Sequence, residues 1–187
     1  RTAIFLPCVT SLVAYSIIFK SLFANDGFIN GMLMNLHVIS EPINWLTNAT
    51  FARILIILAI TWRWTGYNMV FYLSGLQSID DSIYEAASID GANGFQKFFH
   101  MTLPLLKPII LFTTINSTIG TLQLFDEPMN ITQGGPANAT ITISQYIYNL
   151  LFKYQPNFGY AAAVSYVIVV LIVVLSFIQM KVGDKRD

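Results

Sequence analysis

The sequence predicts an all-α protein that crosses a membrane several times. Hydrophobic residues make up 55% of its 187 residues and charged residues only 11%, a composition far from that of an average soluble domain. Four apolar segments each approach the about 20 residues that a helix needs to cross a bilayer core of ~30 Å. No Asp or Glu lies within these four segments, which keeps carboxylates out of hydrocarbon.

The whole chain, 1–187, is expected to form a single membrane domain. Its expected spans are 3–23, 52–73, 105–125 and 161–178. Because the sequence opens at Arg1 and runs directly into the first span, we expect further helices of the same domain to precede it.

The first and third connections between spans differ in character. The first, 24–51, contains Pro42 and Trp45, which favour irregular structure and an anchor at the membrane interface. The third, 126–159, opens with the sequence Gln-Gly-Gly-Pro at 133–136, which predicts a break. A short or re-entrant helix is expected to follow over 141–154.

The second connection, 79–104, is polar and carries helix signals of its own. Two consecutive capping-box patterns start at Ser78 and Ser82, so a helix is expected to begin near Ile79. Gly91 can take a positive φ and turn the chain before a second short helix over 94–101. Pro104 suits the first turn of the next span. The expected product is a bent pair of short helices lying along the membrane surface.

The basic residues predict how the chain is oriented. Four spans place the 79–104 connection and both ends of the chain on one side, which carries Arg1, Lys97, Lys107, Lys181, Lys185 and Arg186. The other side carries only Lys20, Arg53 and Lys153. Because Lys and Arg are enriched in cytoplasmic loops, the 79–104 connection and the C-terminus are expected to be cytoplasmic.

The third span carries small and polar residues at helical spacing. Asn116, Ser117, Thr121 and Gln123 are candidates for lining a transport path, since such a stripe should face the interior of a helix bundle rather than lipid. Helix packing is the alternative interpretation, because small and hydroxyl residues also line contacts between membrane helices.

The second span carries aromatic rings and hydrogen-bond donors on one side of a helix. These residues are Arg63, Trp64, Tyr67, Asn68 and Phe71. A sugar suits such a mixture, because its ring faces stack on aromatics while its hydroxyls need directional partners.

Arg63 lies near the middle of the second span, where a charge is costly and needs water or a partner. It is either a pathway residue or one member of a structural ion pair, with an acidic group of another subunit or of helices outside this sequence. Asp126 and Glu127, at the end of the third span, are expected to be solvated there without a special role.

The spacing of one motif resembles the signature of binding-protein-dependent ABC importer permeases. Glu85-Ala86-Ala87 is followed after three residues by Gly91. Further on, Met101 and Leu103-Pro104 are separated by a single residue. Met101 departs from the pattern, where isoleucine is usual. Segments 44–46, 62–68, 75–79 and 134–140 further resemble the carbohydrate branch, near the maltose, lactose and glycerol-phosphate permeases.

The resemblance implies the type I ABC importer fold and a role for the 79–104 connection. In this family the loop is a coupling helix that docks on a cytoplasmic ATPase subunit. The residues that match the coupling motif are Glu85, Ala86, Ala87, Asp90, Gly91, Leu103 and Pro104. Glu85 would pair with a basic residue of the ATPase, and Ala86 and Ala87 would permit close packing.

The resemblance also implies partners and a bacterial inner-membrane location. Expected partners are a second homologous permease, two ATPase subunits that hold ATP and Mg²⁺, an extracytoplasmic sugar-binding protein, and membrane lipid. Tyr67 and Ser117 fall on sugar-contacting positions of the maltose permease. Ile60 and Thr121 replace asparagines there and Trp64 replaces a glycine, so the sugar is expected to differ from maltose.

Other functions find less support in the sequence. The balance of ten basic and ten acidic residues gives no electrostatic basis for nucleic-acid binding. No catalytic constellation, metal-ligand spacing or cofactor motif is evident, so this chain is expected to carry no enzymatic activity and no cofactor of its own. An amino-acid or peptide permease and an ion-driven secondary transporter remain as alternatives.

Overall fold

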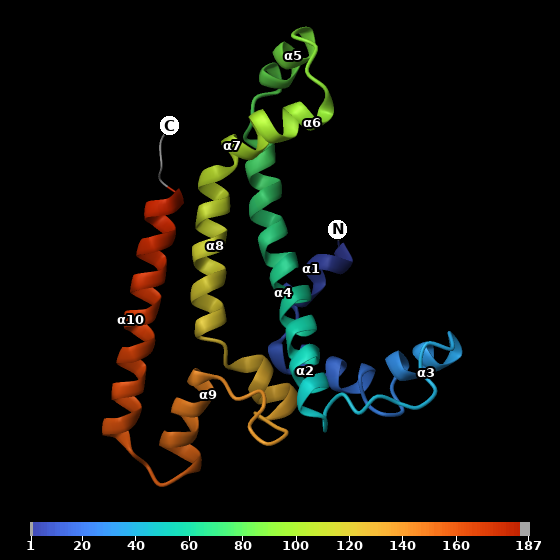
Figure 1. Ribbon diagram of the computed structural model, residues 1–187, viewed down its shortest axis with the longest axis vertical. Helices are drawn as coiled ribbons and strands as arrows, with labels where there is room; N and C mark the ends of the chain where they lie inside the picture. Colours follow the sequence, from blue (N-terminus) through green and yellow to red (C-terminus); the bar gives the residue numbers. More distant parts are fainter. Residues whose placement is uncertain (1, 184–187) are drawn as a thin grey trace.

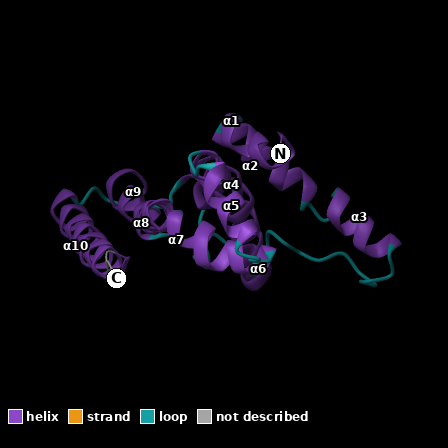
Figure 2. Cartoon of the chain, turned by 90° about the horizontal axis from the view of Figure 1, so that it is seen from above, coloured by secondary structure: helices purple, strands orange, loops and turns teal. Residues whose placement is uncertain are grey.

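A computed structural model describes residues 2–183, and within them every regular element is helical (Figure 1). Seen from above, the helices form an extended row instead of a closed bundle (Figure 2). The row runs from α10 through α8 and α4 to α1, α2 and α3. Long apolar faces on α10 (Phe158–Gly183) stay exposed in the single chain, as expected for helices that meet lipid or another subunit.

The longest helix, α4 (Ala49–Gln77), is the central element and covers the expected span 52–73. It begins at Asn48, whose side chain accepts hydrogen bonds from the amides of Thr50 and Phe51 at 2.9 and 3.3 Å, which satisfies two donors of the first turn. Gly66 lies against the Ile4 carbonyl group, so the absence of a side chain there lets α1 pack directly on α4.

The expected helix over 3–23 is divided in two. It consists of α1 (Thr2–Val9) and α2 (Leu12–Leu22). The break falls at Thr10 and Ser11: the Thr10 hydroxyl donates to the Pro7 carbonyl, and Ser11 caps α2 by accepting from the Ala14 amide at 3.2 Å. A Ser cap competes with continued helix even in an apolar segment.

Two described helices, α4 and α10, are each long and apolar enough to cross a membrane. The third expected span is α8 (Lys107–Leu122), which is bent by 64° from the preceding segment 94–105. Pro104 therefore lies in the short helix α7 (Leu103–Leu105), and Pro108 takes the first turn of α8. The helix α10 covers the fourth expected span, 161–178, and its end at Gly183 lies against Leu111 of α8.

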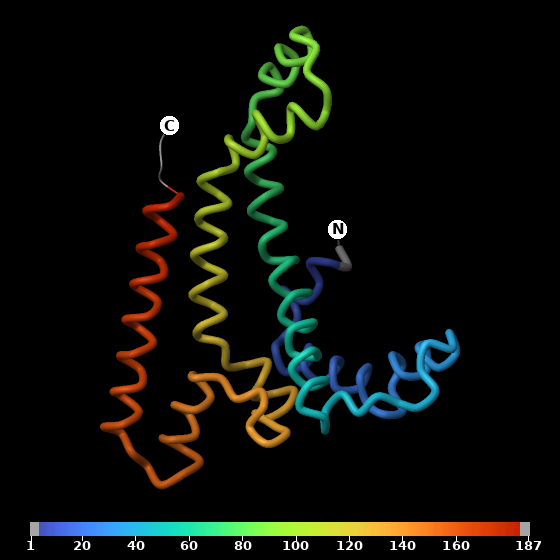
Figure 3. Tube along the Cα trace, in the orientation of Figure 1, coloured from blue at the N-terminus to red at the C-terminus, as the bar shows by residue number. Residues whose placement is uncertain are grey.

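The 79–104 connection projects beyond the ends of α4 and α8 (Figure 3). Its first helix, α5 (Asp81–Ile89), begins two residues later than expected, because Asp80 is the cap and accepts from the Ser82 amide at 2.9 Å. Neither expected capping box forms. The reciprocal box is instead at α6 (Gly94–Lys97), between Asn93 and Gln96. Gly91 has φ +79° and makes the expected turn between the two helices.

The main hydrophobic core lies at the opposite end, where α2 meets the start of α4. It contains Tyr15, Phe19, Phe23, Trp45, Leu55, Ile56, Ala59 and Ile131. The short helix α3 (Phe28–Asn35) is attached to it through Asn30, which is 1% exposed. The Asn30 Oδ1 accepts from the Trp45 indole and the Ile43 amide, both at 3.1 Å.

The third connection combines turns and short helices, as expected. A π-helical turn (Pro128–Thr132) leads to Gln133, Gly134, Ala137 and Asn138, all with positive φ. The expected helix over 141–154 is α9 (Ile143–Tyr148) followed by a second π-helical turn (Asn149–Lys153). The basic residues Arg1, Lys185 and Arg186, used to predict orientation, lie outside the described residues.

Candidate functional site

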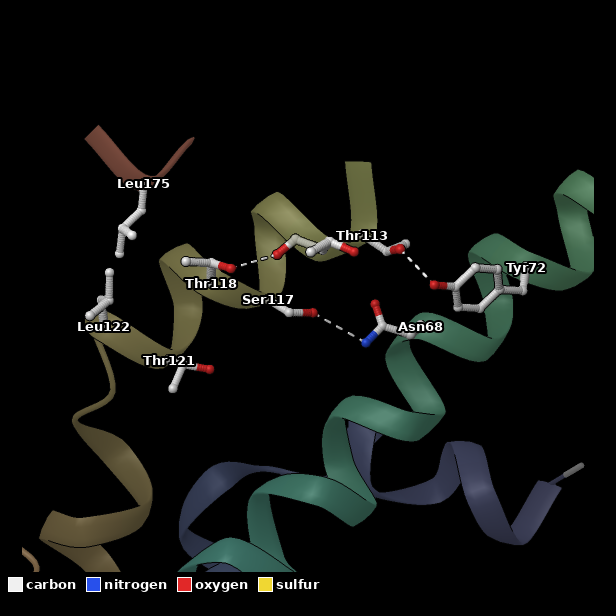
Figure 4. Close-up of a pocket in the computed structure, with 9 residues that line it drawn as sticks. Asn68, Tyr72, Thr113, Ser117, Thr118, Thr121, Leu122 and Leu175 are labelled. Atoms are coloured by element: carbon white, nitrogen blue, oxygen red, sulfur yellow. Dashed lines mark hydrogen bonds between the residues drawn. The ribbon is translucent and has the colours of Figure 1, made fainter. Parts of the chain in front are cut away.

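Hydrogen bonds between side chains connect α4 to α8 along their length. Tyr72 and Thr113 share one at 2.9 Å, and the Asn68 amide donates to the Ser117 hydroxyl at 3.3 Å (Figure 4). On another side of the same contact, the Asn116 amide donates to the Tyr67 hydroxyl at 3.5 Å. The two helices are therefore joined by polar bridges, which replace water for groups at membrane depth.

Two of the grooves beside this contact are rich in hydroxyl groups. The first, the hydroxyl groove, has a volume of about 470 Å³ between α4, α8 and α10, and includes Asn68, Thr118 and Thr121 (Figure 4). The second, the long groove, has about 620 Å³ and extends along α4 from Ile60 to Leu76. Both are lined by Asn68, Tyr72, Ser117 and Thr121.

A third groove, the arginine groove, lies toward the end of α8 that is distant from α5 and α6. It has a volume of about 440 Å³ and is lined by Cys8, Arg63, Trp64, Tyr67, Gly120, Gln123, Leu124, Phe125, Asp126 and Glu127. Its walls thus combine a cation, two carboxylates, an amide and three aromatic side chains, the mixture that can bind a polyhydroxyl compound.

The structure distributes the expected pathway residues over two sides of the α4–α8 contact. Asn68, Ser117 and Thr121 line the hydroxyl and long grooves. In contrast, Arg63, Tyr67 and Gln123 line the arginine groove. Trp64 lines both the long groove and the arginine groove, and Asn116 reaches this set through its bond to Tyr67. The expected pathway residues thus face two separate surfaces, one on each side of the α4–α8 contact.

Aromatic rings follow one another along the side of α4 that bears Tyr67. The centroid of the Tyr67 ring lies 5.4 Å from that of Trp64 and 5.1 Å from that of Phe71. Phe71 then contacts Phe112 of α8 at 5.3 Å. Edge-to-face and tilted contacts at such distances are the favoured arrangements of aromatic pairs, so these rings form one continuous aromatic wall.

Arg63 forms an ion pair within this chain. Its Nη1 donates to the Glu127 Oε1 at 2.8 Å. The Glu127 side chain is only 2% exposed and that of Arg63 is 31% exposed. The expectation of a solvated Glu127 is wrong, because the chain folds back after α8 and encloses that carboxylate beside α4. Only Asp126 keeps partial exposure.

Sequence reasoning missed Tyr72 at the α4–α8 contact. Tyr72 lines two grooves and bonds to Thr113, a residue of the small and polar stripe on the third span for which helix packing is the alternative interpretation. A usable signal was present, since Tyr72 follows Asn68 by one helical turn. Thr113 is buried and also donates to backbone carbonyl groups of its own helix, which agrees with the packing alternative for that residue.

The coupling-motif residues form an exposed projection, with Ala87 as the one internal exception. Glu85, Ala86, Asp90, Gly91, Leu103 and Pro104 are exposed, whereas Ala87 is 2% exposed and faces the interior of the loop. The Tyr84 hydroxyl bonds to that of Thr102 at 2.9 Å and ties α5 to the π-helical turn (Phe98–Thr102) that follows α6. Ile89 and Phe95 are 87% and 80% exposed, an arrangement typical of a protein-binding surface.

The arrangement offers polar, charged and aromatic contacts. Among the described residues, no group of three or more His, Cys, Asp or Glu side chains could hold a metal ion. A polar projection at one end and hydroxyl-lined and charged grooves between membrane-type helices define a membrane transport subunit. The chain belongs to the family described as binding-protein-dependent transport system inner membrane component, whose sequence model matches residues 2–186.

The curated relatives include sugar transport permeases. The chain is 62% identical to the lactose transport system permease protein LacF of Rhizobium radiobacter, covering 100% of this chain and 63% of the relative. It is 36% identical to the arabinooligosaccharides permease protein AraP of Bacillus subtilis, covering 98% and 58%. It is 38% identical to the trehalose/maltose permease protein MalF of Thermococcus litoralis, covering 86% and 53%. The chain thus spans less than two thirds of each of these relatives.

Solved structures confirm the expected all-α permease fold. A chain of a bacterial ABC transporter involved in the import of the acidic polysaccharide alginate matches with a TM-score of 0.86 at 24% identity. The match covers 97% of this chain and 63% of the other. The same kind of transporter, in complex with an alginate pentasaccharide-bound periplasmic protein, matches with a TM-score of 0.76 at 22% identity.

Proposed function

We propose that this chain is part of the permease subunit of an ATP-driven sugar importer. One observation carries the proposal: a projecting loop with the coupling motif stands at one end of helices whose other surfaces form hydroxyl-lined and charged grooves. The curated relatives named for lactose, arabinooligosaccharides and trehalose/maltose support a saccharide as the substrate.

The subunit would provide half of the pathway and would act with separate proteins. These are a second homologous permease, two cytoplasmic ATPase subunits that hold ATP and Mg²⁺, and an extracytoplasmic sugar-binding protein. The position of Gly183 beside the start of α8 supports a shared, cytoplasmic side for the coupling loop and the end of α10. Lys97, Lys107 and Lys181 also gather toward that end.

In the coupling loop, Gly91 sets the bend, and Glu85 and Ala86 face outward toward the ATPase. Ala87 supports the loop from within, since its carbonyl group accepts from the Ala92 amide at 2.9 Å. Closure of the ATPases would move the loop as a unit and switch the grooves between inward and outward access. The Lys97 ammonium group donates to the Ser88 hydroxyl at 2.6 Å, and this bond helps α5 and α6 move together.

The test is ATP hydrolysis by the full-length subunit reconstituted with its partners, with and without sugar-loaded binding protein. Gly91→Pro should abolish the stimulation, because proline cannot take the φ of +79° at this position. Gly94→Pro is the matched control, since Gly94 is the first residue of α6, where proline is tolerated. Stimulation that survives Gly91→Pro would refute the coupling role, and a wild-type complex that no loaded binding protein stimulates would refute the importer.

A further inference from the structure

Trp64 occupies the point where two grooves meet. It lines the long groove together with Ile60, Thr61 and Asn68, and it lines the arginine groove together with Arg63 and Gln123. The arginine groove lies near the end of α8, beside Glu127, whereas the long groove continues toward the coupling loop as far as Leu76. The indole therefore lies between a groove at one end of the helix pair and a groove that extends to the other.

Gly120 of α8 provides the seat for this indole. A Cβ added at Gly120 would lie 2.5 Å from both Cζ2 and Cη2 of Trp64. No real side-chain carbon approaches another atom so closely, so the ring edge lies directly on the α8 backbone. Tyr67 also contacts the indole, edge to face at an interplanar angle of 80°. The indole is thus fixed across the α4–α8 contact.

We infer that Trp64, seated on Gly120, is the partition that separates the arginine groove from the long groove and closes the route between them to sugar. This inference rests on the proposed function. With the indole in place, a saccharide in the arginine groove meets an aromatic wall. Passage toward the coupling-loop end then requires the indole to leave its seat on Gly120.

The experiment uses the full-length subunit, assembled with its partner subunits in proteoliposomes that are loaded with radiolabelled lactose and given no ATP. Wild type should retain the lactose, and Trp64→Ala should lose it. Trp62→Ala is the matched control. Trp62 packs on Tyr15 and Phe19 of α2, at ring distances of 6.2 and 5.7 Å, and is absent from the lining of the three grooves.

Gly120→Ala tests the seat independently. Its methyl group must displace the indole, so this variant should also lose lactose, and the Trp64→Ala/Gly120→Ala variant should leak no faster than Trp64→Ala alone. Co-purification of the partner subunits shows that each variant assembles. Retention by Trp64→Ala, or equal leakage from Trp62→Ala, would overturn the partition, and retention by Gly120→Ala alone would overturn the seat.

The leak assay separates this inference from the proposed function. Lactose serves as a small neutral probe in a passive measurement, which needs neither the binding protein nor ATP hydrolysis. A wild-type complex that fails to take up sugar with ATP would therefore contradict the proposed function. The comparison of Trp64→Ala with Trp62→Ala would still show whether the indole closes the route.

Discussion

Removing Arg63 should be more damaging than removing its partner. Arg63→Met leaves the Glu127 carboxylate buried, at 2% exposure, without the guanidinium that stands 2.8 Å away. Two unit charges about 4 Å apart attract by about 4 kcal/mol at an effective dielectric constant of 20. Breaking a buried pair by deleting one member costs about 3–5 kcal/mol. Because Arg63 is 31% exposed, we expect a loss at the lower end, about 3 kcal/mol.

Glu127→Gln should cost less, about 1 kcal/mol, because the stranded Arg63 can reach water and the glutamine oxygen can still accept its hydrogen bond. The Arg63→Met/Glu127→Gln variant should be less destabilised than the sum of the two single changes. At about 2–4 °C per kcal/mol, Arg63→Met should lower the unfolding midpoint by about 6–12 °C.

The assay is thermal unfolding of the purified full-length subunit in detergent, with transport measured in parallel. A larger loss from Glu127→Gln than from Arg63→Met, or strict additivity in the double variant, would refute the reasoning. Transport also decides the role of the pair. A double variant that regains stability but transports nothing would make Arg63 a pathway residue, whereas recovery of both would make the pair structural.

Two further predictions concern the ends of the molecule. Asn30→Ala should destabilise the subunit by about 3 kcal/mol, because it orphans the buried Trp45 indole and Ile43 amide. Asn30→Asp keeps the acceptor but loses the Nδ2 donor to the carbonyl groups of Ala24, Asn25 and Ile43 and buries a carboxylate at a position only 1% exposed; it should cost at least as much in the same unfolding assay, and a clearly smaller loss would contradict this. At the coupling loop, the hydrogen bond from the Ser82 amide lowers the pKa of Asp80. The Asp80 carboxylate therefore stabilises the start of α5 above its ordinary pKa of 3.8, and this stabilisation is lost as the pH falls through the lowered pKa of the folded protein. The Ser82 amide should exchange its hydrogen faster in Asp80→Ala than in wild type at neutral pH, and this difference should shrink as the pH falls. A difference in exchange rate that does not change with pH would contradict the role of Asp80 as the cap.

Much of the helical framework could be predicted from the sequence because long apolar segments have few alternatives at membrane depth. The spans at 52–73 and 161–178 appear as α4 and α10, and Gly91 turns the coupling loop as its neighbours imply. The break after Val9 could not be predicted from hydropathy, since a single Ser cap decides it. The competition among Ser78, Asp80 and Ser82 for the α5 cap depends on backbone geometry that the pattern leaves open.

The pairing of Arg63 with Glu127 lay beyond sequence reasoning for a different reason. The two residues are 64 positions apart, and only the path of the chain after α8 brings them together. Hydropathy places Glu127 just outside a span, where solvation is the ordinary outcome. The π-helical turn that begins at Pro128 instead directs the chain back along α2 and α4, and this return buries the carboxylate.

The division of the pathway residues follows from how a helix presents a broad polar stripe. Positions 63, 64, 67, 68 and 71 share one side of a helix, as periodicity indicates, but that side is wide enough for α8 to pack into its middle. Residues on one flank, such as Tyr67, then face the arginine groove, and those on the other, such as Asn68, face the long groove. Only Trp64, at the line of contact, reaches both. A sequence can therefore predict which residues meet the pathway, while the packing of α8 determines which of them a sugar can contact at the same time.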